Sequence, residues 1–367
     1  MAAPIRTAVA SAANGFVPRA NFEVSPSIVR SYFLGHHQGA LNSMRKILSN
    51  IGLVIECRDS RVPLTSTNPL LESSLAGRDR IIVYTKSSLS FFKNQSRLKQ
   101  KQKHLLQKWH AERSGRTFDA DDVTASNTHV LFTDKSQPAS IQMLLDTMKD
   151  RAKSADTLTG LRALVVGMPN AGKSSLLNSM RQVGMQKSAA ARTGSNPGIT
   201  RKLSSPGVFV VDTPGVFVPY VGDVNAMLKL ALVGCVKDSV VPWEILADYL
   251  LFNLNLRDPD LYGEFCRPTN SADEFLEAVA LRTGKLEKGG TPALELAATW
   301  IVQQFRSGNL GQFCLDEIDE ENLRSWARKG QAGGDGDEKI SMNQARKREK
   351  EARKVRGLAK RKAAEGG

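Results

Sequence analysis

A chain of 367 residues, of which 41% are hydrophobic, is long enough to build one large or two ordinary globular domains. Its 51 basic and 37 acidic residues give a formal net charge of +14, which favours a polyanionic partner such as RNA or an anionic membrane surface. The four cysteines form no CxxC pair, and no apolar run approaches the roughly 20 residues of a membrane-spanning helix. A disulfide framework, a zinc site and a transmembrane segment are therefore not predicted.

The first 30 residues are rich in alanine and serine, and they carry Arg6, Arg19 and Arg30 against one acid, Glu23. A secretory signal needs an unbroken apolar centre, which this segment lacks. An Arg-rich segment with few acids is typical of a mitochondrial transit peptide. We therefore predict a transit peptide at residues 1–30, with a disordered terminus as the alternative.

Short apolar runs alternate with helical patterns over residues 31–220. Five runs have the length of buried strands: residues 53–57, 81–84, 129–132, 162–166 and 208–211. Strands that alternate with helices usually form a parallel sheet with helices on both faces. The predicted fold class is therefore α/β, with a mostly parallel sheet of the P-loop NTPase type.

Helical periodicity without strand signals follows residue 220. It predicts a small all-α domain over residues 221–329, in which Ser271 and Thr291 are expected as helix N-caps. Residues 330–367 are predicted to be a flexible linker and a basic tail. From Lys339 onward the chain has 11 Lys or Arg and 3 Glu, a net charge of +8 that either binds RNA or is only solvated.

The stretch "GMPNAGKSS" satisfies the phosphate-loop spacing GxxxxGK[ST] with Gly167, Gly172, Lys173 and Ser174. It follows the apolar "RALVV" and precedes the helical "SSLLNSMRQV", which is the context that a P-loop requires. Backbone NH groups of such a loop surround the phosphates, the lysine neutralises the β and γ phosphates, and the serine hydroxyl binds Mg²⁺. The loop residues predicted to bind nucleotide are Asn170, Ala171, Gly172, Lys173, Ser174 and Ser175.

Two further motifs follow this P-loop. Asp212 ends the apolar run "VFVVD", where its carboxylate is expected to hold Mg²⁺ through water, and the Gly215 NH is expected to contact the γ phosphate. Thr200 belongs to the polar loop "TGSNPGIT" and is the expected magnesium ligand of the triphosphate state. Loops that order around a γ phosphate are the basis of GTPase switches. The predicted metal ligands are Ser174, Thr200 and Asp212.

In GTPases an NKxD motif reads guanine through its aspartate, and none follows Asp212. Upstream, the apolar "RIIVY" leads into "TKSSLS", so that Thr85, Lys86 and Ser88 occupy the place of an NKxD loop. The later "LFTDKSQ", with Thr133, resembles the SAK element that borders the base. Base loops that precede the P-loop indicate a circular permutation, which is tolerated because domain termini commonly lie close together.

This order of motifs resembles the circularly permuted GTPases of the YlqF/RbgA family over about residues 32–315. The stretches "YFLGHHQGAL", "ECRDSRVPLTSTNP", "LKLALVGCVKD" and "FRSGNLGQF" extend the resemblance. It implies a Mg²⁺-dependent GTPase that assists assembly of the large ribosomal subunit in mitochondria. The implied partners are GTP and GDP, the mitochondrial large subunit with its rRNA, and the matrix face of the inner membrane as a peripheral attachment.

The chain departs from the family pattern in two places. Ser88 replaces the aspartate that reads guanine and Thr85 replaces the asparagine, which leaves guanine selectivity open. Val216 stands where Ras-like enzymes have the glutamine that orients water. The resemblance implies that His36 takes over this catalytic role, and that Asn170 helps to bind a potassium ion.

Three functions are compatible with these motifs. The first is a ribosome-assembly GTPase that acts as a ribosome-stimulated switch. The second is an RNA- or ribosome-binding placeholder with a degenerate nucleotide site, which Ser88 favours and the intact Lys173 and Asp212 oppose. The third is a P-loop kinase, which the switch-like "TGSNPGIT" and "DTPG" disfavour because a kinase has no use for them.

Overall fold

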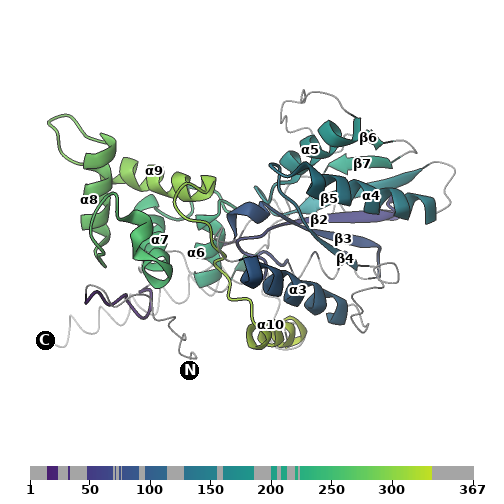
Figure 1. Ribbon diagram of the computed structural model, residues 1–367, viewed down its shortest axis with the longest axis horizontal. Coiled ribbons are helices and arrows are strands. Elements are labelled where there is room, and N and C mark those ends of the chain that lie inside the picture. Colours follow the sequence, from purple (N-terminus) through teal and green to yellow (C-terminus); the bar gives the residue numbers. More distant parts are fainter. Residues whose placement is uncertain are drawn as a thin grey trace, which may run out of the picture. The chain divides into compact units, whose positions relative to one another are not determined.

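The computed structural model divides the chain into two compact units, Met1–Asp319 and Glu320–Gly367. The first unit contains a six-stranded sheet and most of the helices (Figure 1). The second contains the helix α10 (Glu320–Ala332). The structure describes residues 15–23, 32–33, 48–68, 71, 74–75, 77–90, 96–113, 128–154, 160–185, 200–204, 208–212, 220–221 and 224–332.

The strands of the large sheet are β2 (Leu53–Asp59), β3 (Arg80–Thr85), β4 (Thr128–Phe132), β5 (Leu161–Gly167), β6 (Thr200–Ser204) and β7 (Val208–Asp212). Their order across the sheet is β4-β3-β2-β5-β7-β6, and only the pairing of the edge strand β6 with β7 is antiparallel. All five predicted strands are confirmed. The strand β6 was not predicted, because its sequence "TRKLS" has no apolar run.

Helices cover both faces of this sheet, as predicted. Ile55 and Val165 belong to one apolar cluster with the inward side chains of α4 (Pro138–Ser154) and α5 (Lys173–Met185). Tyr84 points to the opposite face, where its hydroxyl lies 2.8 Å from Nε2 of His110 in α3 (Ser96–Arg113). Because side chains alternate along a strand, buried parallel strands supply apolar surface to both layers.

A two-stranded antiparallel sheet joins β1 (Tyr32–Phe33) to β8 (Tyr220–Val221). These strands lie at the two ends of the region that the sequence assigns to the GTPase domain. Ends that lie side by side are the condition under which a permuted chain order is tolerated. The described residues of the first unit also form the short 3-10 helices η1 (Leu48–Asn50), η2 (Ser87–Leu89) and η3 (Pro259–Tyr262).

The described residues after β8, 224–332, are mainly helical and include α6 (Val224–Leu232), α7 (Trp243–Arg257), α8 (Ala272–Thr283) and α9 (Leu294–Ser307). Ser271 is the N-cap of α8, as predicted, and its side chain accepts a hydrogen bond from the Glu274 NH. The prediction for Thr291 is wrong, because α9 begins after Ala293. Pro292 disfavours a helical conformation at Thr291, whose carbonyl instead closes a turn with the Glu287 NH.

None of the helices in the described part of the chain is long and apolar enough to cross a membrane.

The helical region is held to the sheet through the buried Asp316, which follows α9. Its Oδ2 accepts hydrogen bonds of 2.8 Å from the backbone NH groups of Leu64 and Thr65, in the loop after β2. Its Oδ1 lies 3.0 Å from Nζ of Lys229 in α6. One carboxylate thereby links three segments that are far apart in the sequence.

A close contact between α9 and η2 provides a test of this packing. Gly308 ends α9 at φ 83°, and a Cβ there would lie 2.4 Å from Cδ2 of Leu89. Gly284 ends α8 at φ 67°, and a Cβ there would meet nothing within 4 Å. We expect Gly284→Ala to lower the free energy of unfolding by about 1 kcal/mol, through backbone strain alone.

Gly308→Ala should be more destabilising by a further 1–3 kcal/mol or so, because Leu89 must also move. Urea unfolding of both variants measures the difference. In a Leu89→Ala background the two glycine substitutions should have equal effects, since the obstructing methyl is gone. A difference that persists in this background would contradict the packing described.

Candidate nucleotide-binding site

Loops at the carboxyl ends of neighbouring strands surround a cavity of about 340 Å³. Parallel sheets commonly bind ligands at this edge, because all the strands end there together. Six of the residues that line the cavity are nucleotide-binding residues predicted from sequence: Thr85, Lys86, Ser88, Thr133, Gly172 and Ser175. The base loops and the P-loop, which lie in separate parts of the sequence, therefore share one cavity.

Glycines allow the P-loop to approach its neighbours closely. Gly167 has φ 139°, and a Cβ there would lie 2.3 Å from the backbone oxygen of Cys57 in β2. Gly172 has φ 89°, and a Cβ there would lie 2.9 Å from Oγ1 of Thr85. Lys173 begins α5, and its Nζ donates to the carbonyls of Gly167 (3.2 Å) and Met168 (2.9 Å). The loop therefore leads into a helix N-terminus, which is a favourable environment for phosphate.

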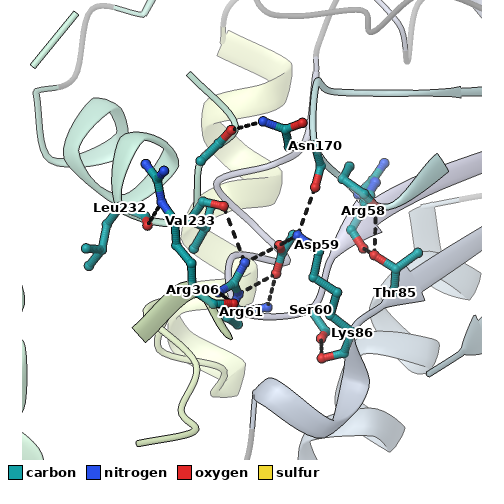
Figure 2. A network of polar contacts seen from close by, with 12 residues as sticks. Arg58, Asp59, Ser60, Arg61, Thr85, Lys86, Asn170, Leu232, Val233 and Arg306 are labelled. Carbon is teal, nitrogen blue, oxygen red and sulfur yellow. Dashed lines mark hydrogen bonds and ion pairs between the residues drawn. The ribbon is translucent and has the colours of Figure 1, made fainter. Parts of the chain in front are cut away.

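Two residues at the end of β3, Thr85 within the strand and Lys86 directly after it, hold the P-loop. The Thr85 hydroxyl donates to the carbonyl of Ala171 (2.7 Å), and Lys86 Nζ donates to the carbonyl of Asn170 (2.8 Å; Figure 2). Lys86 has φ 55°, in the left-handed region that side chains rarely adopt. The base loop and the P-loop are thereby fixed to each other by side chain-to-backbone hydrogen bonds.

The buried carboxylate of Asp59, the last residue of β2, positions Lys86. Its Oδ2 lies 2.8 Å from Lys86 Nζ and 2.7 Å from a guanidinium nitrogen of Arg61. Burial alone raises the pKa of Asp59, but the charges of Arg61 and Lys86 outweigh it and hold the pKa well below its ordinary value. Asp59 is therefore ionised at neutral pH.

Side chains from three segments bind the carbonyls at the end of α6 (Figure 2). Nε of Arg306 donates to the carbonyl of Leu232 (3.1 Å), a guanidinium nitrogen of Arg61 donates to that of Val233 (3.3 Å), and Nδ2 of Asn170 donates to that of Gly234 (2.8 Å). The last carbonyls of a helix lack partners within the helix, so these bonds satisfy acceptors that would otherwise be unpaired. They also connect the P-loop to the helical region.

A second carboxylate faces the cavity from the loop after β4. Asp134 accepts hydrogen bonds from the backbone NH (3.0 Å) and the hydroxyl of Ser88. Burial raises the pKa of Asp134, but hydrogen bonds from Ser136 and Ser88 outweigh this effect and lower it. The sequence predicts a nucleotide-binding role for Thr133 of this loop but not for Asp134. A carboxylate next to a predicted base-binding residue was the available signal.

The backbone brings the predicted magnesium ligands to the same edge of the sheet. Ser174 is exposed in the first turn of α5. Asp212 pairs with Val165 of β5, and Thr200 pairs with Val211 on the neighbouring strand. Two hydroxyls and a carboxylate are hard oxygen donors that fit Mg²⁺. The side chains of Thr200 and Asp212 are outside the described part of the structure, as are residues His36, Gly215 and Val216.

The ion pairs of Asp59 give a test by pH and mutation. Asp59→Asn should lower the free energy of unfolding by about 3–5 kcal/mol at pH 7, because Arg61 and Lys86 lose their buried counter-ion. The folded-state pKa of Asp59 is lowered from 3.8, so the stability it contributes is complete above that pH and is lost as the pH falls below it.

Urea unfolding at pH 7 and pH 3 should therefore show a smaller effect of Asp59→Asn at pH 3. Asp146→Asn is the matched control, because this side chain is 54% exposed on α4. It should change the stability by less than about 0.5 kcal/mol at either pH. An effect of Asp59→Asn that is equally small at pH 7 would contradict the assigned role.

Residues 162–252 match the protein family described as 50S ribosome-binding GTPase. Mitochondrial GTPase 1 of Schizosaccharomyces pombe is 36% identical over 318 residues, which cover 84% of this chain and 95% of that protein. Mitochondrial ribosome-associated GTPase 1 of Xenopus tropicalis is 32% identical over 320 residues, which cover 81% of this chain and 98% of that protein.

The crystal structure of GNP-bound YlqF from T. maritima has a similar fold, with a TM-score of 0.50 and 22% sequence identity. The match covers 77% of this chain and 99% of that chain. The predicted P-loop GTPase fold of the YlqF type is thereby confirmed. Because the relatives share over 30% identity along nearly their whole length, this chain belongs to the family of mitochondrial GTPase 1 and mitochondrial ribosome-associated GTPase 1.

Proposed function

We propose that this protein binds and hydrolyses GTP as a ribosome-stimulated switch in the assembly of the mitochondrial large ribosomal subunit. The observation that carries this proposal is the shared cavity, in which Lys86 and Thr85 hold the P-loop backbone at 2.8 and 2.7 Å. A purine nucleotide contacts a base loop and a phosphate loop at the same time, so its binding requires the two loops to lie at a fixed distance from each other. The names of the relatives include the words mitochondrial, ribosome-associated and GTPase, which supports the location, the partner and the nucleotide that we propose.

The P-loop contacts the phosphates and the metal. Lys173 turns from its own loop carbonyls to the β and γ phosphates, and the NH groups at the start of α5 bind phosphate oxygens. Ser174, Thr200 and Asp212 would hold Mg²⁺, and the bound ion would supply positive charge beside the phosphates. The NH of Gly215 contacts the γ phosphate, so the loops around it differ between the GTP and GDP states.

Hydrolysis requires a group that orients water, and Val216 does not provide one. His36 performs this role, since an imidazole hydrogen-bonds water near neutral pH. Asn170 would hold K⁺ through its amide oxygen, since the bond from its Nδ2 to the Gly234 carbonyl orients the amide. The bound ion would supply positive charge to the phosphate site. Turnover therefore depends on K⁺, and replacement of K⁺ by Na⁺ lowers it.

The protein acts in the mitochondrial matrix, at the inner face of the inner membrane, after removal of a transit peptide within residues 1–30. The domain boundaries proposed from sequence are residues 31–220 for the GTPase domain, 221–329 for the helical domain and 330–367 for the linker and basic tail. The helical domain and the tail contact rRNA, because the tail carries a net charge of +8 from Lys339 onward. Membrane association is peripheral.

Calorimetric titration with GTP, GDP and ATP tests the nucleotide site. We expect GTP and GDP to bind, and Lys173→Ala to weaken GTP binding at least about tenfold, because a charge-assisted contact to phosphate is lost. Lys153→Ala is the control, since this side chain is 69% exposed at the end of α4. Absence of all nucleotide binding would favour the placeholder, and a preference for ATP would favour a kinase.

Co-sedimentation with mitochondrial large subunits tests the proposed partner. We expect more protein to sediment with GTP than with GDP, and Lys173→Ala to remove this difference. Deletion of the residues after Lys339 should weaken association and flatten its dependence on salt, because fewer phosphate contacts release counter-ions. Nucleotide affinity should not change in the deletion. Sedimentation that is independent of the nucleotide would contradict a switch.

A further inference from the structure

Ser88 occupies the position at which a GTPase usually reads guanine with an aspartate, and a serine alone is a poor replacement. Guanine presents two donors on this edge, the N1–H and the 2-amino group, whereas adenine presents an acceptor at N1. A free hydroxyl has one donor and two acceptor lone pairs, and it rotates to suit either base. A free Ser88 hydroxyl would therefore not distinguish the two purines.

The Ser88 hydroxyl is not free, because Asp134 fixes it. Oδ2 of Asp134 receives the backbone NH and the hydroxyl of Ser88, and Oδ1 receives the NH (2.9 Å) and the hydroxyl of Ser136. An ionised carboxylate is an acceptor only, with about four lone-pair positions. The four donors fill these positions, so Asp134 has no acceptor left for a base. Because an ionised carboxylate cannot donate, the Ser88 hydroxyl must be the donor of the hydrogen bond to Asp134.

We propose that Ser88 and Asp134 act as one guanine-recognition unit, in which Asp134 fixes the Ser88 hydroxyl as an acceptor toward the nucleobase. The two remaining lone pairs of Ser88 Oγ then accept from the N1–H and the 2-amino group of guanine. Asp134 is a positioning residue that acts through Ser88. This inference rests on the proposed function, because it assumes that a guanine nucleotide occupies the cavity.

The position and the charge of the pair support this assignment. Both residues line the cavity that Thr85 and Gly172 also line, so the pair borders the space in which we propose that the nucleotide binds. The lowered pKa of Asp134 keeps its charge at neutral pH. Donation to a charged acceptor strengthens the hydroxyl as an acceptor in turn. Adenine would place its N1 lone pair against the lone pairs of Ser88 Oγ.

The loop after β4 also holds Asp134 rigidly. Its backbone NH donates to the hydroxyl of Ser140 in the first turn of α4 (3.1 Å), and its carbonyl accepts from the NH of Gln137 (3.0 Å). The NH of Ser87 donates to the carbonyl of Thr133 (3.1 Å), which joins the two base loops by their backbones. A carboxylate fixed in this way sets the direction of the Ser88 hydroxyl before any ligand binds.

Titration of the full-length protein with GDP, IDP and ADP tests the inference. IDP lacks the 2-amino group, and ADP presents an acceptor at N1. We expect the unaltered protein to prefer GDP to both. Asp134→Asn and Ser88→Ala should each weaken GDP binding by at least about tenfold, since an oriented hydrogen bond to the base is lost. ADP affinity should stay the same, so the preference for GDP over ADP falls by the same factor.

Two variants separate recognition from folding. Ser136→Ala removes a hydroxyl from the same carboxylate but leaves the bonds from Ser88, so it should retain the preference for GDP over IDP and ADP. Ser88→Thr retains the hydroxyl and should also retain this preference.

The double variant Ser88→Ala, Asp134→Asn should bind GDP no more weakly than the weaker single variant, because the pair acts as a unit.

The results distinguish two kinds of failure. If the unaltered protein binds none of the three nucleotides, the proposed function itself is overturned. If it binds GDP, but Ser88→Ala and Asp134→Asn keep the same preference over ADP, only the pair is overturned. Unchanged ADP affinity in these variants shows that the phosphate site is folded, so a loss of GDP preference then supports the inference.

Discussion

The arrangement of the site depends on the buried negative charge of Asp59 at the end of β2. A buried carboxylate is stable only if it is paired and hydrogen-bonded, and here Arg61 and Lys86 supply both conditions. Lys86 in turn reaches the P-loop, and Arg61 reaches the end of α6. The base loop, the P-loop and the helical region therefore meet around one charge.

This arrangement compensates for the order of motifs along the chain. In a permuted sequence the base loop does not follow the P-loop, so no covalent connection of the usual kind fixes their distance. The strands β3 and β5 are separated in the sheet by β2, and residues at the ends of all three complete the link. The bonds from Thr85 to Ala171 and from Lys86 to Asn170 then set the geometry that connectivity leaves open.

Sequence patterns predicted the local features of this structure and missed the non-local ones. Strand periodicity and P-loop spacing are properties of short segments, so the five parallel strands and the loop before Lys173 can be predicted from the sequence. The strand β6 is polar, and its backbone pairs with β7 at the edge of the sheet. Asp134 and Gly234 gain their roles from residues 46 and 64 positions away, Ser88 and Asn170, which no pattern in one sequence reports. Thr291 is not a helix N-cap, because the following Pro292 disfavours a helical conformation at Thr291.

The free energies of these interactions indicate which links within the site are the strongest. Separation of a buried ion pair such as Asp59 with Arg61 costs about 3–5 kcal/mol, so this pair stays intact. A hydrogen bond such as that from Asn170 to the Gly234 carbonyl contributes only about 1 kcal/mol net. The orientation of the Asn170 amide, and with it the link between the P-loop and the end of α6, therefore depends on the weaker of these two interactions.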